Sequence, residues 1–291
     1  MNPETNAARM PIRKIPFEFI DTIDPIWNAA KPEWSHMVNG TSLAMPYLEP
    51  FLIKNVREAL AQIDEPSLAE DVRAFVGQEA QHYTNHRRYN EVLKRNGYPE
   101  LEAVEAEMAQ TYKRLETKSL KWRLAYTAGF ETMTIGLTEW LIRERSDLFT
   151  HANPVVASLV LWHMVEETEH KTVAFDVYQH LYGHYFMRVY GLFYAALHVM
   201  FSARRTYKLM LQRDGTWRQW SSRVRLWRMV GQFYRNVTPA LFRSLAPGHH
   251  PDHVADPDWI AQWATAYAEL PAQVVPLLDT DDPAIPARFV S

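Results

Sequence analysis

Two copies of the motif Glu-x-x-His, each preceded by an isolated glutamate, constrain the fold of this chain more than any other feature. The six residues of this pattern are Glu49, Glu79, His82, Glu131, Glu167 and His170. A four-helix bundle that encloses two metal ions uses this set: two helices supply one glutamate each, and two supply Glu-x-x-His. A single motif arises often by chance, but the repeated pattern does not. It predicts an all-α bundle with a dinuclear metal site.

Two further histidines share the helical faces of these motifs. Residues three, four and seven positions apart lie on one face of an α-helix. His86 therefore shares a face with Glu79 and His82, and we interpret it as a distal ligand or as a residue that supports a ligand. His163 lies one turn before Glu167. A lone histidine in an apolar helix is more often a hydrogen-bonded core residue, but at this spacing we expect a seventh ligand.

Glutamates at adjacent positions leave one assignment open. Glu166 fits the metal-facing arc as well as Glu167 does, and only the register of the first motif favours Glu167.

Glu131 is the only charged residue between Leu124 and Leu137, which favours a ligand over a surface acid. Four carboxylates balance two divalent ions, whereas each would lose several kcal/mol of hydration if buried without them. The alternative is a set of unrelated surface acids and core histidines.

The chain contains no cysteine. Disulfides, thiolate nucleophiles, iron–sulfur clusters and cysteine-based zinc sites are therefore excluded. Imidazole and carboxylate ligands suit iron, manganese or zinc. We expect two metal ions per chain, either two irons or a manganese–iron pair, with dioxygen as a cosubstrate.

Prolines and glycines divide the chain into segments. We predict an irregular N-terminal arm over residues 1–40, a ferritin-like bundle over 41–183, and C-terminal helices over 184–291 that pack on the bundle within one continuous domain. Long helices are expected to begin near Pro46, Pro66 and Pro154, since proline suits a first helical turn.

An apolar stretch over residues 185–203 is interrupted by Arg188 and His198, and its longest uncharged part is shorter than the ~20 residues of a membrane span. We therefore expect a packed helix there. The N-terminus lacks the apolar core of a secretory signal, so a cytoplasmic location is expected.

The C-terminal third is basic. Ten of the 31 Lys and Arg residues lie between Arg204 and Arg243, together with a single acid, Asp214. Apolar residues recur at helical spacing from Trp217 onward, as in an amphipathic helix at a membrane surface. The simpler interpretation is that its aromatic side chains pack on the bundle. The alternative is that residues 204–243 contact a membrane peripherally or bind an anionic acyl substrate. Nucleic acid is not expected, because the chain is acidic overall and carries no recognition motif.

Five segments carry a resemblance to a known family: Gln78–His86, Trp162–Lys171 followed by Ala174-Phe175-Asp176, Pro46–Glu49, Phe130-Glu131, and Pro-Gly-His-His-Pro at residues 247–251. Together they resemble the predicted metal-dependent hydrolases over most of the chain, with a departure at Leu48, where glycine is expected. The resemblance implies a ferritin-like fold and a metal more directly than it implies hydrolysis. The spacing of His163, Glu167 and His170 is also similar to that of the di-iron arylamine N-oxygenases, which carry one additional histidine.

Three functions fit these features. We expect a di-iron enzyme that activates dioxygen to oxidise a hydrophobic or acyl-type substrate, with an electron donor as partner. The alternative is a metal-dependent hydrolase that uses a metal-bridging water. Iron storage is a third hypothesis, which the large C-terminal extension disfavours. No catalytic base stands out beyond the ligands; candidates for supporting them are Tyr83, His86, Thr134 and Glu139. A homodimer is the assembly we consider.

Overall fold

The computed structural model describes residues 10–271 and 273–290. Its elements in chain order are α1 (Pro32–Ser42), α2 (Met45–Leu60), α3 (Pro66–Arg95), α4 (Leu101–Leu115), α5 (Leu120–Arg143), α6 (Arg145–Phe149), α7 (Pro154–Glu169), α8 (Val173–Leu181), α9 (Tyr185–Arg213), α10 (Trp220–Ser244), the 3₁₀ turn Pro251–His253, α11 (Asp258–Ala268), β1 (Leu277–Leu278) and β2 (Phe289–Val290). Nearly all regular structure in the described chain is helical, which confirms the predicted all-α class.

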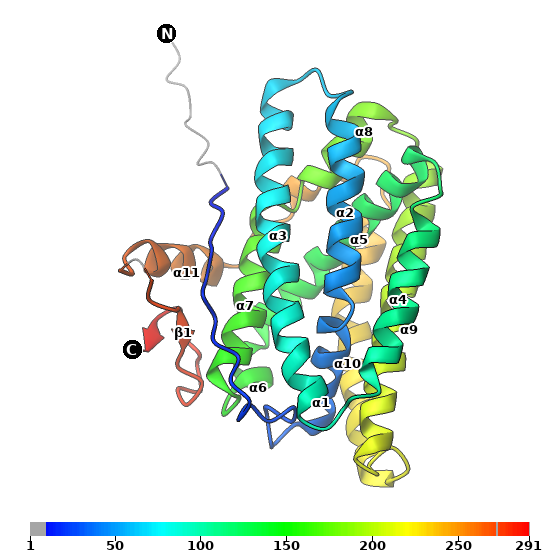
Figure 1. Ribbon diagram of the computed structural model, residues 1–291. Coiled ribbons are helices and arrows are strands. Elements are labelled where there is room, and N and C mark those ends of the chain that lie inside the picture. Colours follow the sequence, from blue (N-terminus) through cyan, green and yellow to red (C-terminus); the bar gives the residue numbers. More distant parts are fainter. Residues whose placement is uncertain (1–9, 272, 291) are drawn as a thin grey trace.

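Helices α2, α3, α5 and α7 form a ferritin-like bundle (Figure 1). Helix α2 packs along α3 and α5, and α7 packs on the same two helices, so each helix turns one face to a common interior. Local signals set the helix ends. The side-chain oxygen of Asn153 accepts hydrogen bonds from the backbone N–H groups of Val155 and Val156, which caps the start of α7. Gly97 follows α3 with a φ of 120°, a conformation that favours glycine and ends the helix.

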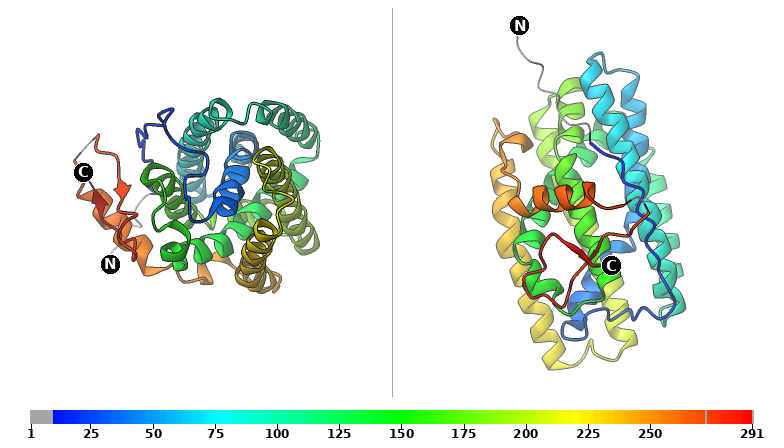
Figure 2. Two further views of the ribbon diagram at one scale, coloured as in Figure 1. Left: turned by 90° about the horizontal axis from the view of Figure 1, so that it is seen from below. Right: turned by 90° about the vertical axis from the view of Figure 1, so that its left-hand side faces the viewer.

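The C-terminal helices α9 and α10 pack against α5 outside this bundle, as Figure 2 shows from below. The backbones of α9 and α5 approach closely: a Cβ atom added at Gly191 would lie 2.1 Å from the carbonyl oxygen of Ala125, and one added at Gly129 would lie 2.5 Å from the carbonyl carbon of Gly191. Only glycine fits at such a contact. Within the described chain, α9 alone is long and apolar enough to cross a membrane by length and composition. Its packing along α5 and α1 agrees with the prediction of a packed helix.

The N-terminal segment runs in an extended path along the bundle (Figure 1) and buries Phe17, Ile23 and Trp27. The irregular part ends earlier than predicted, because Pro32 begins α1 in its first turn. The first nine residues of the predicted arm lie outside the described residues.

The helix predicted from Asn153 to near Gly183 is divided into α7 and α8. His170 closes α7 in a non-helical conformation, with φ −106° and ψ 11°, so the chain turns directly after the second Glu-x-x-His motif. The ribbon of β1 and β2 was not predicted, because strands of two residues carry no alternating pattern. The backbone N–H of Leu278 in β1 donates to Oγ of Ser158, which attaches this C-terminal segment to α7.

Candidate metal centre

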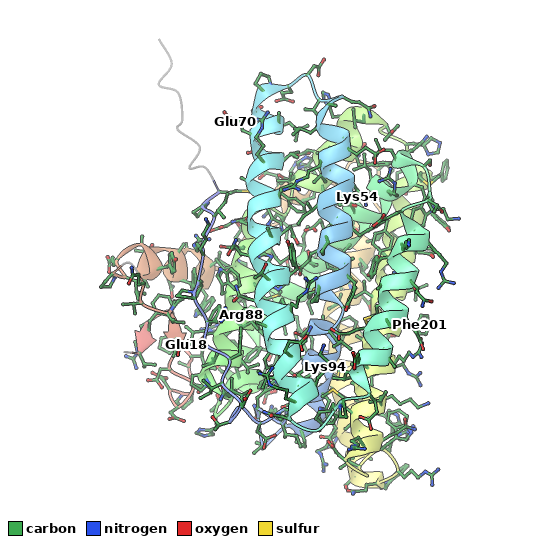
Figure 3. The ribbon with its side chains drawn as sticks, in the orientation of Figure 1. Glu18, Lys54, Glu70, Arg88, Lys94 and Phe201 are labelled. Carbon is green, nitrogen blue, oxygen red and sulfur yellow. The ribbon has the colours of Figure 1, made fainter. Side chains whose placement is uncertain are left out.

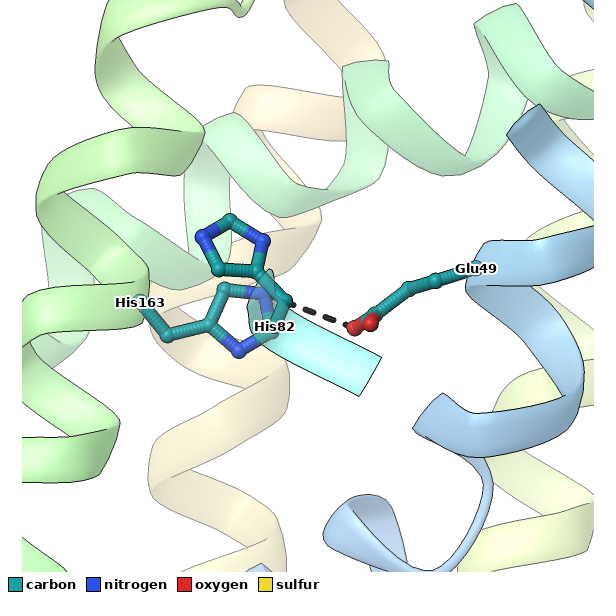
Figure 4. Close-up of side chains that lie close together, drawn as sticks. All are labelled: Glu49, His82 and His163. Carbon is teal, nitrogen blue, oxygen red and sulfur yellow. Dashed lines mark ion pairs between the residues drawn. The ribbon is translucent and has the colours of Figure 1, made fainter. Parts of the chain in front are cut away.

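The seven predicted ligands converge inside the bundle in two groups. Glu49, His82 and His163 form one group, and Glu79, Glu131, Glu167 and His170 form the other; within each group the candidate ligand atoms all lie within 4.8 Å of one another. None of the seven residues is more than 5% exposed. Figure 4 shows the first group, in which Nε2 of His163 lies 3.7 Å from Oε1 of Glu49.

Many atoms of this cluster are buried without a hydrogen-bond partner among the described residues. They are both carboxylate oxygens of Glu49, Glu79 and Glu131, Oε2 of Glu167, Nδ1 of His82 and Nε2 of His170. Burying an unsatisfied polar atom costs about 1–3 kcal/mol, and more if it is charged. Acceptor atoms that converge in this way would be stabilised by a positive charge between them. The donor set, four carboxylates and imidazole nitrogens, fits two divalent metal ions.

The protonation of His82 is fixed from outside the cluster. Its Nε2 lies 2.9 Å from Oε2 of Glu166 and donates to it. Glu166 also accepts a hydrogen bond from Arg13 of the N-terminal segment, and Arg13 forms a second ion pair with Glu169. Since a neutral imidazole carries one proton, Nδ1 of His82 keeps a free lone pair toward the cluster. Burial raises the pKa of Glu166 to about 7, and Arg13 opposes that rise.

This contact separates the roles of the two adjacent glutamates that the sequence left open. The Glu167 carboxylate lies within the second group, whereas Glu166 lies against His82 and Arg13. Metal-binding imidazoles commonly donate their second N–H to a carboxylate that fixes the orientation of the ring, and Glu166 lies in that position relative to His82.

His170 is fixed in a similar way by Gln78. The Gln78 amide nitrogen donates to the carbonyl oxygen of Pro11 and to Glu169, so its Oε1 is the acceptor for Nδ1–H of His170 at 2.9 Å. The remaining nitrogen, Nε2, therefore carries the lone pair in neutral His170. It lies within 3.5 Å of an oxygen from each of Glu79, Glu131 and Glu167.

A chain of hydrogen bonds starting at Asn90 fixes His163. The Asn90 amide nitrogen donates to the Ser42 carbonyl oxygen, and its Oδ1 accepts from the Ser42 hydroxyl. Because the Ser42 hydrogen is used there, Ser42 Oγ accepts from Nδ1–H of His86 at 2.8 Å. Nε2 of His86 then accepts from Nδ1–H of His163, also at 2.8 Å. Nε2 of His163 then faces the cluster, 2.8 Å from Oε1 of Glu167 and 3.7 Å from Oε1 of Glu49. His163 and Glu167 share a proton across this contact, and a bound cation would take its place on Nε2.

The pKa shifts of the cluster also favour a site for cations. Burial, reinforced by neighbouring carboxylates, raises the pKa of Glu49 and Glu79 well above their usual range and that of Glu131 to about 8. Burial alone would also raise the pKa of Glu167, but His170 and His163 lower it. Burial would lower the pKa of His170, but Glu167 and Glu131 raise it well above its usual range. A divalent cation between these carboxylates would lower their pKa values, because it favours the charged form of each.

Two of the predicted supporting residues lie away from the cluster. The half-buried Tyr83 ring packs beneath the guanidinium of Arg87, and Glu139 pairs with Arg243. Neither makes a hydrogen bond or ion pair with a candidate ligand in the described chain. Thr134 donates to the backbone carbonyl of Glu131. Among the residues that orient the imidazoles, directly or through a partner, His86 was predicted in this role and Glu166 was weighed as a ligand, whereas the sequence analysis missed Arg13, Ser42, Gln78 and Asn90.

A cavity of about 370 Å³ reaches the cluster from between α1, α5, α7, α9 and α10. Its inner end includes Ser42, His86, Thr134, His163 and Glu167. Its walls are mainly apolar and include Met37, Met45, Phe130, Met133 and Met164. Its outer end includes Arg204, Trp217, Arg223, Trp227 and Tyr234. A cavity with few polar groups at one end and flexible methionines along its walls is typical of a site for an apolar organic molecule.

A comparison with known protein families matches residues 11–255 to one described as predicted metal-dependent hydrolase. The chain belongs to this family. The match spans all seven candidate ligands and the residues that fix the three imidazoles of the cluster. The description of this family names a metal, and the buried cluster has the ligands to bind one. No curated protein and no solved structure matched the chain.

Proposed function

We propose that the seven clustered residues bind two divalent metal ions, and that the protein hydrolyses an ester or amide bond in a largely apolar substrate. The observation that carries this proposal is the orientation of the three imidazole rings. One nitrogen of each ring faces the buried carboxylates and is free to bind a cation, while the opposite nitrogen is hydrogen-bonded to a partner outside the cluster. The family description supports metal-dependent hydrolysis over the dioxygen chemistry that we expected from the ligand pattern.

Two metal ions, when bound, would lower the pKa of a shared water and polarise the scissile carbonyl. The protein supplies orientation and an environment that excludes bulk water. Phe130, Met133 and Met164 form apolar walls next to Glu167, so the chain of the substrate lies against the cluster. Glu166, Gln78 and His86 keep the imidazoles from rotating. Water adds across the ester or amide bond, giving a carboxylic acid and an alcohol or amine.

The test compares p-nitrophenyl esters of increasing acyl length with protein loaded with Zn²⁺ or Mn²⁺ under strict anaerobiosis. We expect hydrolysis that requires the metal and prefers longer acyl chains, because the cavity walls are apolar. A Glu131→Gln variant should lose this activity, since it removes one carboxylate from the cluster. His198→Gln serves as a control, because His198 is bonded to Tyr126 outside the cluster. Metal-loaded protein without activity on any ester or amide would overturn the proposal.

A second candidate is oxidation of an organic substrate by dioxygen at two irons or at a manganese–iron pair, with an external electron donor. The apolar walls beside the cluster favour it, because they would hold a hydrocarbon rather than a polar scissile group against the metals. Oxygen consumption by iron-loaded, reduced protein, measured with an electrode, tests this candidate. Dioxygen uptake without anaerobic hydrolysis would replace the first proposal with the second.

A further inference from the structure

Exposed large apolar side chains are concentrated on α9 and α10. Of the thirteen found in the described residues, nine lie on these helices: Phe186, Tyr190, Phe193, Leu197, Phe201, Trp220, Trp227, Tyr234 and Phe242. Those of α9 recur every three or four residues, and three aromatic residues of α10 recur every seven, so each helix carries an apolar stripe. A soluble monomer rarely exposes apolar surface of this extent without using it.

The two stripes meet at the outer end of the cavity. Leu197 and Phe201 of α9 line the cavity, and so do Trp227 and Tyr234 of α10. Phe201 is 64% exposed and is labelled in Figure 3. Trp220, which is 72% exposed, extends this surface through a ring contact with Trp227. Apolar side chains therefore continue from the walls of the cavity to the surface of the molecule.

The charge around this opening is positive. Arg205 and Arg213 form ion pairs with Glu107 and Glu100, but Arg204, Arg218 and Arg228 are exposed and form none within the described chain. Arg204 also lines the cavity. Arginine beside exposed tryptophan and tyrosine matches the headgroup region of a bilayer, where the aromatic rings enter the interface and the guanidinium groups meet lipid phosphates.

We propose that this surface docks on a bilayer that contains anionic lipids, and that an acyl chain enters the cavity directly from it. We define the docking rim as Leu197, Phe201, Trp220, Trp227 and Tyr234 with Arg204, Arg218 and Arg228. The charge of the rim selects anionic lipid over a second copy of this chain, because two such rims facing each other would bring like charges together. Only the identification of the entering chain as substrate rests on the proposed function; the docking does not.

The test is co-sedimentation of the full chain with phosphatidylcholine vesicles that do or do not contain phosphatidylglycerol, over a series of salt concentrations. We expect binding to the anionic vesicles that weakens with salt. A double variant Arg218→Gln/Arg228→Gln should bind roughly 25-fold more weakly, at about fivefold for each cation removed. A Trp220→Ser variant should lose the binding that remains at high salt. This assay needs neither metal nor turnover, so its failure is distinct from a failure of hydrolysis.

Matched controls change the same residue types elsewhere. Arg73→Gln alters an exposed arginine of α3, and Ile20→Ser alters an exposed apolar residue of the N-terminal segment; both should bind like the unmodified chain. Equal losses in the control and rim variants would overturn the proposal. A second result would also overturn it: the chain forms a dimer in light scattering, Trp220→Ser dissociates this dimer, and the unmodified chain does not bind vesicles. A second copy of the chain would then cover the rim.

Discussion

His163 donates a hydrogen bond from Nδ1 to Nε2 of His86 across 2.8 Å, and this contact assigns the other nitrogen of His163 to the cluster. The direction of the bond follows from Ser42 and Asn90. The Ser42 hydroxyl donates to Asn90, so it accepts from Nδ1–H of His86, and Nε2 of His86 is left as an acceptor. Nε2 of His163 then lies 2.8 Å from Oε1 of Glu167, where a metal ion could replace the proton that this pair shares. The chain of hydrogen bonds therefore supports a seventh ligand independently of its spacing in the sequence.

We predict that Ser42→Ala weakens metal binding. The substitution removes the acceptor for Nδ1–H of His86, so His86 and His163 can exchange tautomers and the lone pair of His163 is no longer held toward the cluster. Loss of such an outer partner typically costs 10–100-fold in metal affinity. Competition with a chelator measures the change. Ser35→Ala is the matched control, since Ser35 is an equally buried serine of α1 that is bonded to Asn28. An unchanged affinity in Ser42→Ala would contradict the assignment.

Substituting the two adjacent glutamates should produce different defects. Glu167→Gln removes a cluster carboxylate and should lower the metal content by about one ion per chain, if each group binds one ion. Glu166→Gln keeps every candidate ligand but weakens the acceptor for Nε2 of His82, so two ions should still bind, with about 10–100-fold lower affinity. Elemental analysis and chelator competition separate these outcomes. The reverse pattern would make Glu166 the ligand.

The different predictability of these two glutamates has a physical cause. Spacing along a helix is fixed, so the two motifs and His163 could be placed on inward faces from the sequence alone. Glu166 and Glu167 differ by only 100° of rotation, and what separates them is contact with His82 and Arg13. Arg13 lies 153 residues away along the chain, in a segment without periodicity, so no local pattern could reveal it. The break after α7 was missed for a similar reason, because no proline or glycine marks it.

Metal binding should stabilise the fold strongly. The cluster buries carboxylate oxygens that have no hydrogen-bond partner among the described residues, and the pKa of Glu49 and that of Glu79 are raised by burial and by neighbouring carboxylates. A ligand that binds only the folded state, present at 100 times its dissociation constant, adds about 2.7 kcal/mol to the free energy of unfolding. Thermal unfolding of metal-stripped protein should therefore shift upward with Fe²⁺, Mn²⁺ or Zn²⁺. Ca²⁺ should have little effect, because it prefers oxygen ligands alone. No shift with any of the three metals would contradict the assignment.

Asp214 should contribute stability that depends on pH. Its carboxylate accepts hydrogen bonds from His36 in α1 and from Tyr98 after α3, which ties the end of α9 to both helices. Burial would raise the pKa of Asp214, but these hydrogen bonds outweigh it and lower the pKa. A lowered pKa in the folded state means that the contribution is present above the unfolded pKa of ~3.9 and is lost as the pH falls through the folded value.

The variant Asp214→Asn tests this contribution. At neutral pH it should lower the free energy of unfolding by about 1.5–3 kcal/mol, the usual range for hydrogen bonds to a charged group. The difference from the unmodified chain should shrink in denaturant titrations below about pH 4. A difference that stays constant down to that pH would show that the charge of Asp214 is not what the contact requires. Asp252→Asn is the control, since its side chain is exposed.

The close contact between α9 and α5 predicts opposite effects for two glycine-to-alanine substitutions. A Cβ atom at Gly191 would lie 2.1 Å from the Ala125 carbonyl oxygen, so Gly191→Ala must separate two backbones and should cost about 1–3 kcal/mol. Gly231 lies exposed in α10 with no atom of the described residues near the position of an added Cβ, so Gly231→Ala should stabilise the helix by up to about 1 kcal/mol. Denaturant unfolding measures both. Because α9 forms one side of the cavity, Gly191→Ala should also weaken binding of an acyl ligand, whereas Gly231→Ala should not. Equal stability of the two variants would mean that α9 tolerates displacement from α5.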